Sequence, residues 1–349
     1  MISSSFRGAL IGCGFFAENH MHGWSCVPGA KIVALCDTNA ERLVAMAKRF
    51  GIASTYTDMH AMLAAEKLDF VDVATTASSH RSIIEAVAPH VKLVICQKPF
   101  AETMADAEAM VACCASHGTE LLIHENFRWQ HGFLAVRKLI EEGCIGDLQY
   151  ARFTFQHGFD NYVNQPYLAK IERLAIMDVG LHLFDLARWL LGEVAQLSCA
   201  TQHRNPNVRG EDAFTALLAH ENGAISVSEC SFATVLVPEP FPQTIAVIEG
   251  DRGTIELDRD YKLSIHHAGQ VETISVEPKV PVWGAKPWHC VQDSVINLQT
   301  HARDVLRGRS KPEPSGLDNL KTLTLALAAY ESAASGKMIA MANWTEKIA

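Results

Sequence analysis

The chain has 349 residues, 48% of them hydrophobic and 20% charged, which is typical of a globular protein with room for two domains of about 100–200 residues each. Its formal net charge of −9 argues against nucleic acid or an anionic membrane as the main partner, and no apolar run reaches the roughly 18 residues of a membrane span. Residues 1–7 are too short and polar for a signal peptide. The ten cysteines include no Cys-x-x-Cys pair, so we expect free thiols, no metal site and a cytoplasmic location.

Short apolar runs alternate with amphipathic stretches over the first third of the chain. The apolar runs are residues 9–11, 31–36, 70–75, 93–96 and 121–124, and helical patterns lie between them, for example over 39–50 and 104–117. Buried strands that alternate with helices predict a parallel sheet covered on both faces, which is the doubly wound α/β arrangement. We assign residues 1–125 to this first domain.

Longer strands follow after about residue 145. They are expected over 147–157, 195–204, 213–220, 224–232, 244–249 and 254–258. The Asn222-Gly223 dipeptide between two of them is typical of a hairpin. Helical patterns cover 178–191, 291–306 and 317–334. The sequence therefore predicts a second α/β domain, residues 126–349, with a large, mostly antiparallel open sheet.

The loop after the first strand is typical of a dinucleotide site. Its sequence, Gly12-Cys13-Gly14-Phe15-Phe16-Ala17, fits the pattern Gly-x-Gly-x-x-Ala. Gly12 allows the tight turn, Gly14 lets the backbone approach a pyrophosphate, and Ala17 is small enough for close packing of helix and strand. The N–H groups at the start of the helix would face the phosphates. The alternative is a glycine turn in an unrelated doubly wound domain.

An acidic residue ends the second strand. Asp37 lies 25 positions after Gly12, where a carboxylate can bond the ribose hydroxyls and repel a 2′-phosphate. The next residues, Thr38 and Asn39, offer no arginine to bind that phosphate. We therefore expect NAD, in preference to NADP, as the cofactor.

Two further groups of residues suit proton chemistry. Lys98 follows the fourth strand, and ligands of such sheets lie outside the carboxyl ends of the strands. An ammonium there can stabilise developing negative charge or relay a proton. Asp178 and His182 are four residues apart in a helical pattern and share a helix face, with Gly180 between them. Taken singly, the lysine could be a surface turn, and the Asp-x-x-x-His pair could be a surface or capping pair.

The sequence resembles the Gfo/Idh/MocA family, the group of glucose–fructose oxidoreductase and inositol dehydrogenase, from about Gly8 to Gly336. The resemblance rests on the Gly12 loop, on Asp37, on Lys98-Pro99 and on residues 178–182. Weaker similarities are Glu211-Asp212 and the segment 249–254.

That resemblance implies a Rossmann domain, a second α/β domain, and reversible hydride transfer between a nicotinamide and a sugar or polyol carbinol. His182 would accept the proton, while Lys98 and Asp178 would orient the substrate and tune the site. Lys98 would also contact the cofactor. The other positions that match the family's cofactor-binding segments are Thr75, Thr76, His80, Gln97, Asn126 and Arg128. A homodimer or homotetramer is implied as well.

The chain departs from the family pattern at two places. The family usually has glutamate before the Lys-Pro pair, whereas this chain has Gln97, which can still bond a ribose hydroxyl but lacks the negative charge. The segment 74–80 lacks the usual Pro-Asn, which bears on its cofactor contacts.

Polar and aromatic side chains in the second domain suit a polyhydroxylated ligand. They include His157, Asn161 and Tyr162, and a second cluster contains Trp283, Trp288 and His289. Both clusters could equally be loop anchors. The specific expectation is an aldose, with D-apiose as one candidate, oxidised to its lactone. The alternatives are an inositol or deoxy-sugar dehydrogenase, an NAD-assisted glycosidase, and a non-catalytic NAD sensor.

Overall fold

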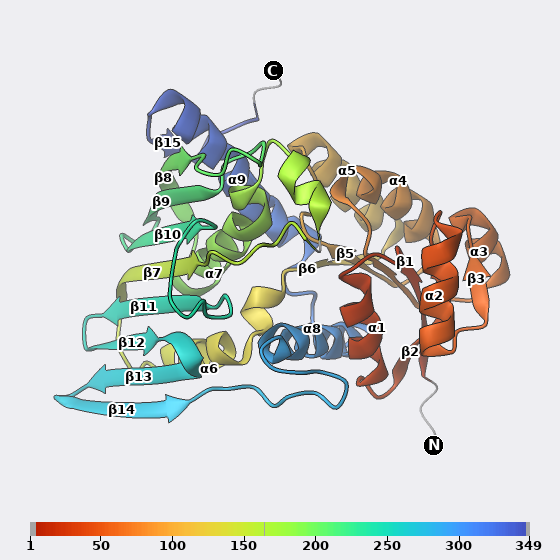
Figure 1. Cartoon of the computed structure of the whole chain (residues 1–349), viewed down its shortest axis with the longest axis horizontal. Helices are drawn as coiled ribbons and strands as arrows, with labels where there is room; N and C mark the ends of the chain where they lie inside the picture. The colour runs from red at the N-terminus through yellow and green to blue at the C-terminus, as the bar shows by residue number, and fades with distance from the viewer. Residues whose placement is uncertain (1–4, 164, 347–349) are drawn as a thin grey trace. The chain divides into compact units, whose positions relative to one another are not determined.

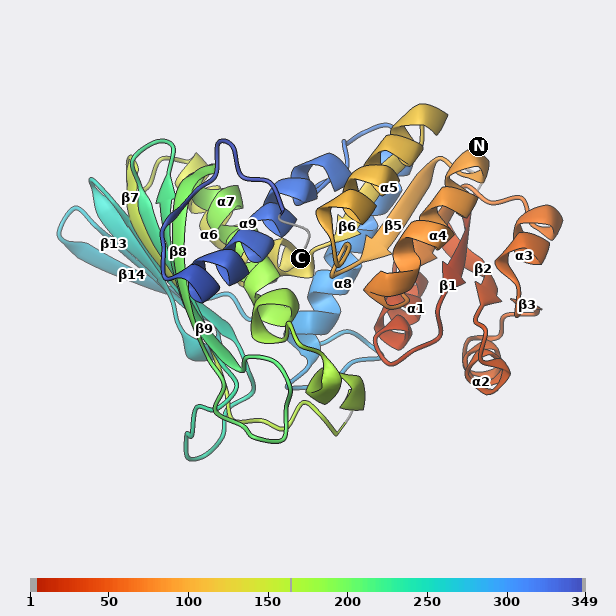
Figure 2. The same ribbon diagram turned by 90° about the horizontal axis from the view of Figure 1, so that it is seen from above.

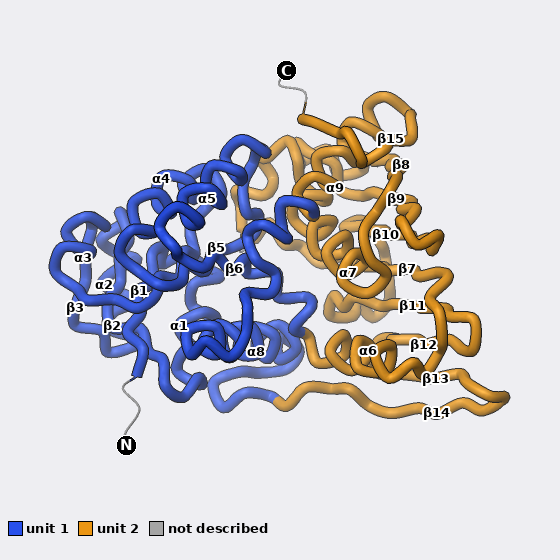
Figure 3. The backbone as a smooth tube through the Cα atoms, turned by 180° about the vertical axis from the view of Figure 1, so that it is seen from behind, with its two compact units in different colours: residues 1–129, 280–321 blue, residues 130–279, 322–349 orange. Residues whose placement is uncertain are grey.

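Two separate sheets organise the chain (Figure 1). The structure is a computed structural model that describes residues 5–163 and 165–346. It divides into two compact units, residues 1–129 with 280–321 and residues 130–279 with 322–349 (Figure 3). Each unit contains one sheet.

The first unit contains a parallel six-stranded sheet of order β3-β2-β1-β4-β5-β6. Its strands are β1 (Phe6–Ile11), β2 (Ala30–Cys36), β3 (Ser54–Tyr56), β4 (Phe70–Val73), β5 (Leu93–Gln97) and β6 (Glu120–His124). Helices α1 (Ala17–Ser25), α2 (Ala40–Phe50), α3 (Met59–Ala65), α4 (Ala77–Val87) and α5 (Met104–His117) connect them. This strand order is that of a Rossmann domain, and it confirms the predicted doubly wound α/β sheet.

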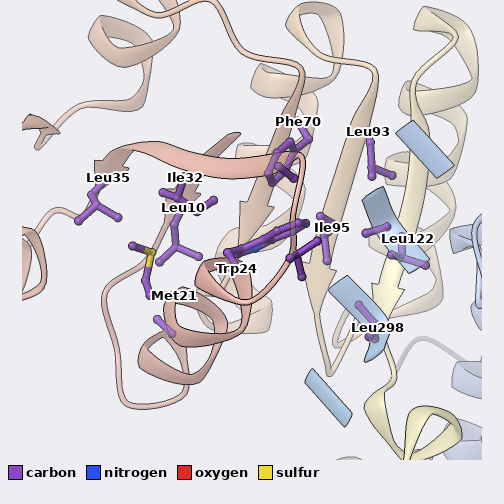
Figure 4. Packing of buried hydrophobic residues seen from close by; sticks show 14 of the residues in the cluster. Leu10, Met21, Trp24, Ile32, Leu35, Phe70, Leu93, Ile95, Leu122 and Leu298 are labelled. Carbon is purple, nitrogen blue, oxygen red and sulfur yellow. The ribbon is translucent and has the colours of Figure 1, made fainter. Parts of the chain in front are cut away.

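The sheet is buried because helices cover both of its faces. Every residue of β4 and β5 is buried, as expected for central parallel strands. Figure 4 shows the core on the α1 side, where Leu10, Phe70 and Ile95 pack beside Trp24. The carboxyl ends of β1 and β4 adjoin where the strand order reverses, which is the usual ligand position in such sheets.

A late segment of the chain completes this unit. Helix α8 (His289–Leu306) contributes Leu298, Ala302 and Val305 to the same core as α1. The sequence analysis placed residues 280–321 with the second domain, and the structure groups them with the first unit. The physical reason is the apolar face of α8, which is buried against the Rossmann core.

The second unit contains a nine-stranded sheet of order β14-β13-β12-β11-β7-β10-β9-β8-β15. Its strands are β7 (Leu148–Gln156), β8 (Val194–Gln202), β9 (Ala213–His220), β10 (Ile225–Ser231), β11 (Thr244–Gly250), β12 (Gly253–Leu257), β13 (Lys262–His267), β14 (Gln270–Ser275) and β15 (Ile339–Ala340). All neighbouring pairs are antiparallel except β7 with β10. The mostly antiparallel sheet is confirmed.

Helices cover one face of this second sheet. They are α6 (His131–Glu141), α7 (Leu181–Leu191) and the later turns of α9 (Gly316–Ser335), and Figure 2 shows them on the same side. Over the described residues of this unit, no helix lies on the opposite face, so that face is open. Short 3-10 helices occur at Ala88–His90, Asn126–Trp129, Pro166–Lys170 and Arg259–Tyr261.

The sequence analysis did not predict the hairpin of β13 and β14. Ala268 and Gly269 form its two-residue turn, both with positive φ (51° and 75°), the conformation of a hairpin turn that matches strand twist. The Ala-Gly pair is a weaker signal than Asn-Gly, which explains the omission. Among the described residues, no helix is both long and apolar enough to cross a bilayer.

Candidate active site

The turn between β1 and α1 requires glycine at its first position. Gly12 has a φ of +98°, and a Cβ atom there would lie 2.7 Å from the carbonyl oxygen of Ala74, at the end of β4. Its N–H donates to the carbonyl of Cys36, at the end of β2, over 2.8 Å. Gly12 therefore lies closely between the carboxyl ends of two neighbouring strands.

The rest of this turn has the properties of a pyrophosphate site. No atom lies within 4 Å of the position that a Cβ of Gly14 would take, so backbone and ligand can approach there. Ala17 is buried and begins α1, and no side chain caps the helix at Phe16. The N–H groups of the first helical turn thus attract an anion. These residues fit the dinucleotide predicted from the sequence.

Asp37 holds the same turn in place. One carboxylate oxygen accepts the N–H of Cys13 over 2.6 Å, and the other accepts the N–H of Asn39 over 2.7 Å. Burial, followed by the charge of Asp37, raises the pKa of the Cys13 thiol to about 12. The thiol is therefore protonated and unreactive. Asp37 links the end of β2 to the glycine turn, at the position expected of a ribose-binding carboxylate.

Thr75, Thr76 and His80 follow β4. Thr75 is beside Gly12, because its Cγ2 would lie 2.9 Å from a Cβ there. His80 is completely buried, and its ring nitrogens lie 3.0 Å from the carbonyl oxygen of Phe100 and 3.3 Å from that of Thr75. Burial lowers the pKa of His80. The His80 ring thereby joins the backbone at Thr75 to the backbone at Phe100.

Gln97 and Lys98 follow β5. Gln97 is buried, with 8% of its surface exposed, and its Oε1 accepts the backbone N–H of Lys98 over 2.8 Å. Lys98 is half-buried, and the peptide bond from it to Pro99 is cis. The structure thus places Lys98 at the carboxyl edge of the parallel sheet, as the sequence predicted.

Asn126 and Arg128 contact the late segment of the first unit. Asn126 donates to the hydroxyl of Ser294 over 2.8 Å, and Arg128 donates to Asp318 over 2.9 Å. Both side chains are buried, each about 4% exposed. These contacts attach α8 and the start of α9 to the Rossmann unit. The expected approach of the two residues to the cofactor stays a prediction.

Asp178 and His182 belong to an unusual helix in the second unit. Residues Ile176–Gly180 form a π-helix, in which the N–H of Leu181 bonds the carbonyl of Ile176. Helix α7 continues directly from it and contains His182, which is buried. Such π-helical turns are rare and occur frequently at functional sites. The sequence analysis predicted a regular helix over 178–191, and the π-turn at its start is a difference.

Glu211 supports this π-helix from a neighbouring segment. Its carboxylate accepts the N–H groups of Leu174 (3.1 Å) and Ile176 (2.9 Å) and the hydroxyl of Tyr330 (2.7 Å). The sequence analysis noted Glu211 only as a weak similarity and assigned it no role. Since the carboxylate is buried, we infer that it positions the segment containing Asp178.

Gly180 allows the π-helix to approach β9. A Cβ atom there would lie 3.1 Å from the ring of Phe214, closer than most packed carbon atoms. The sequence analysis expected Gly180 to permit close approach of a ligand or backbone. In the structure, the closest neighbour is an aromatic ring.

His157, Asn161 and Tyr162 follow β7 in the second unit. The amide of Asn161 lies 3.3 Å from Nε2 of His157, whose ring is buried and stacks on Phe232 at 4.9 Å between centroids. Burial lowers the pKa of His157 and raises that of Tyr162 to about 12. The structure brings His157 and Asn161 into contact. The directions of the two pKa shifts leave the side chains of His157 and Tyr162 neutral near pH 7.

The residues of the second aromatic cluster differ in their surroundings. Trp283 stacks on His22, with ring centroids 4.5 Å apart and planes 6° apart, and donates to the Cys26 thiol over 3.2 Å. It therefore anchors its loop to α1 within the first unit. Trp288 is partly exposed and His289 is buried. Among the described residues the structure forms no cluster of potential metal ligands, and the ten cysteines are free thiols.

Comparison with known families gives two matches along this chain. A family model for oxidoreductases with an NAD-binding Rossmann fold, GFO_IDH_MocA, matches residues 6–125. The model of the GFO/IDH/MocA C-terminal domain matches residues 133–256. The chain belongs to the GFO/IDH/MocA family. The predicted family, enzyme class and NAD cofactor are thereby confirmed.

Similar members of the GFO/IDH/MocA family cover nearly the whole chain. A D-apiose dehydrogenase of Paraburkholderia graminis is 48% identical over 96% of this chain and 89% of its own length. One from Rhizobium rhizogenes is 46% identical over 97% of this chain and 98% of its own. An oxidoreductase from Agrobacterium radiobacter, crystallised with NAD+, L-tartaric acid and magnesium, superposes with a TM-score of 0.95. The two sequences are 46% identical, and the superposition covers 97% of this chain and 99% of the Agrobacterium radiobacter chain.

Proposed function

We propose that this protein oxidises D-apiose at its anomeric carbon, with NAD as the cofactor and the lactone as the product. The observation that carries the proposal is the identity of 48% and 46% to two proteins named D-apiose dehydrogenase, over nearly the whole chain. The glycine turn and Asp37 support it independently, because they have the geometry of a dinucleotide site.

The cofactor would lie on the first unit. NAD supplies the hydride acceptor when bound. The turn Gly12–Ala17, including the exposed Phe15, holds the pyrophosphate, and Asp37 bonds the ribose hydroxyls. Thr75 and Thr76 approach the dinucleotide from the end of β4, while His80 keeps that segment in position.

Three side chains would carry the proton chemistry. Neutral imidazole suits removal of a hydroxyl proton near pH 7, so His182 accepts the proton of the sugar hydroxyl. The ammonium of Lys98 stabilises the negative charge that develops on the oxygen. Asp178 orients the same hydroxyl.

The second unit would bind the sugar and join subunits. His157, Asn161 and Tyr162 offer hydrogen-bonding groups on aromatic surfaces, which suit a polyhydroxylated substrate. The open face of the nine-stranded sheet is the expected interface of a homodimer or homotetramer. We place this enzyme in the cytoplasm, in keeping with its free thiols.

The test mixes purified protein with NAD or NADP and D-apiose, other aldoses, inositols, deoxy sugars and glycosides. Net formation of NADH with D-apiose, together with the lactone or its hydrolysed acid, is the expected result. Preferred turnover of an inositol or a deoxy sugar would move the assignment to that substrate. Bond cleavage without net NADH would indicate a glycosidase, and NAD binding without turnover on any compound would indicate a sensor.

A further inference from the structure

A carboxylate is buried inside the Rossmann sheet. Asp72 is on β4 between apolar residues, and its side chain is completely buried. It accepts the indole N–H of Trp24 over 2.7 Å and faces Nδ1 of His20 at 2.9 Å. Burial of a carboxylate costs more free energy than an apolar residue of similar size would, even when it is hydrogen-bonded. Folding alone therefore does not explain Asp72.

His20 connects this carboxylate to the residue before Lys98. His20 is on α1 and completely buried, and its Nε2 lies 3.5 Å from Nε2 of Gln97. The backbone N–H of Lys98 can only donate, so the Gln97 atom that it contacts at 2.8 Å is the amide oxygen. The other end of the amide, its NH2 group, consequently points to His20.

The chemistry of each partner of His20 indicates the direction of its contact. Asp72 accepts, so Nδ1 of His20 carries the hydrogen; Gln97 donates, so Nε2 of His20 presents its lone pair. These partners assign the Nδ1–H tautomer to His20. The ring is further held by a stack on His124, with centroids 4.2 Å apart, and by the edge of Phe16 at 5.5 Å. Phe16 belongs to the glycine turn, so the network is next to the cofactor loop.

We propose that Asp72 and His20 are positioning residues for Lys98. They fix the orientation of the Gln97 amide, and its oxygen holds the backbone of Lys98 at the carboxyl end of β5. This inference deepens the proposed function and rests on the role of Lys98 in it. It also explains Gln97: a carboxylate at that position would face the lone pair of His20, whereas an amide offers the donor that His20 requires.

A charge swap tests the network. Both oxygens of Asp72 contact Nδ1 of His20, at 3.0 and 2.9 Å, and the second of them also accepts from Trp24. In Asp72→Asn, an amide oxygen on Trp24 can still accept from Nδ1, but the NH2 group then faces the same hydrogen. Relief of that contact shifts the imidazole hydrogen to Nε2, against the Gln97 donor. In Gln97→Glu, a carboxylate faces the His20 lone pair, and the ring can bond both carboxylates only if it takes up a proton. The double variant Asp72→Asn/Gln97→Glu makes every contact complementary again, since the new carboxylate accepts from both His20 and Lys98.

The expected result is a loss in each single variant and a recovery in the double variant. At roughly pH 9, well above the pKa of an ordinary histidine, the proton that His20 needs in Gln97→Glu is least available. There we expect each single change to lower kcat about tenfold or more, because small misplacements of reacting groups are costly. The double variant should recover to within about threefold of the unmodified protein, a strong positive coupling. If the two losses simply multiply, the three side chains do not act as a unit and the proposal is wrong.

Two controls separate positioning from folding and from the choice of substrate. Thr119→Val removes buried hydrogen bonds to the carbonyls of Ala88 and Val91 elsewhere in the same unit and should lower Tm without lowering kcat.

Nitrogen NMR of the His20 ring should show hydrogen on Nδ1 and a lone pair on Nε2. Exchange of the Lys98 amide hydrogen should be faster in Asp72→Asn and slow again in the double variant. These two measurements need no turnover, so they decide the network even if no sugar is oxidised; the opposite tautomer, a charged imidazole or unchanged exchange would overturn it.

Discussion

Two backbone N–H groups, those of Cys13 and Asn39, bond the carboxylate of Asp37. A carboxylate has about four lone-pair positions, so it can still accept ribose hydroxyls while it holds the turn. At the scale of single residues, Asp37 thus combines two functions. The sequence analysis predicted the ribose contact from the position of Asp37, but the contact with the turn depends on folding.

Replacing Asp37 should therefore change both cofactor choice and affinity. Asp37→Ala removes the charge that repels a 2′-phosphate, so the ratio of kcat/KM for NAD to that for NADP should fall about tenfold or more, equivalent to roughly 1.4 kcal/mol. Asp37→Asn keeps one oxygen for the turn and should bind NADH more tightly than Asp37→Ala does. A ratio that does not change in either variant would show that Asp37 does not contact the ribose.

Lys98 and His182 should affect turnover far more than cofactor binding. We expect Lys98→Met and His182→Asn each to lower kcat by about 10²–10⁴, the usual contribution of a positioned proton-transfer group, with little change in NADH affinity. Matched controls are Lys138→Met and His131→Asn on α6, since both positions are exposed. Near-native turnover in both test variants would remove these residues from the mechanism.

At the scale of elements, the two glycines of the β1–α1 turn meet two different requirements. Gly12 has positive φ and no room for a Cβ, whereas no atom lies near the Cβ position of Gly14. The first glycine is required by the fold, and the second leaves space for a ligand. The same motif thus contains one structural and one binding requirement.

Alanine substitutions should distinguish the two requirements. Gly12→Ala should lower the free energy of unfolding by about 1–3 kcal/mol through backbone strain and the contact with Ala74. Gly14→Ala should change it by less than about 0.5 kcal/mol, while the Kd for NADH rises about tenfold or more, or roughly 1.4 kcal/mol. Chemical denaturation and fluorescence titration measure the two quantities. Unchanged NADH affinity in Gly14→Ala would contradict the proposed approach of the pyrophosphate.

Helix periodicity predicted the elements that contain Asp178 and His182 but not their local geometry. The spacing of four residues fits one helical face, and a helix does form there. Glu211 bonds two N–H groups at the start of this segment from 35 and 37 residues away in sequence. No local pattern in residues 174–182 contains that information.

At the scale of the whole molecule, the open face of the nine-stranded sheet has an apolar component. Leu217 on β9 and Ile225 on β10 are 40% and 43% exposed, on neighbouring strands. Apolar side chains on an uncovered sheet face are typical of an interaction surface. A second copy of the chain is the proposed partner.

A charge on this face should separate the subunits. Light scattering should give the unmodified protein two or four times the chain mass of 38.3 kDa, and Leu217→Arg should shift it toward the monomer. The matched control is Leu317→Arg, because Leu317 is 68% exposed but belongs to the first unit and not to the nine-stranded sheet. A monomeric unmodified protein, or a mass that Leu217→Arg leaves unchanged, would contradict the proposed interface.

The sequence by itself determined the elements and motifs that depend on neighbouring residues. Alternating apolar runs specified the parallel sheet, longer strands specified the antiparallel sheet, and the Gly12 turn with Asp37 specified a dinucleotide site, because periodicity and turn chemistry are local properties. Only the tertiary structure decided the contacts between distant residues. Asp72 contacts His20 across 52 positions of sequence, and α8 packs on the Rossmann core from much later in the chain. Packing and buried hydrogen bonds make these contacts, and no local pattern of residues encodes them.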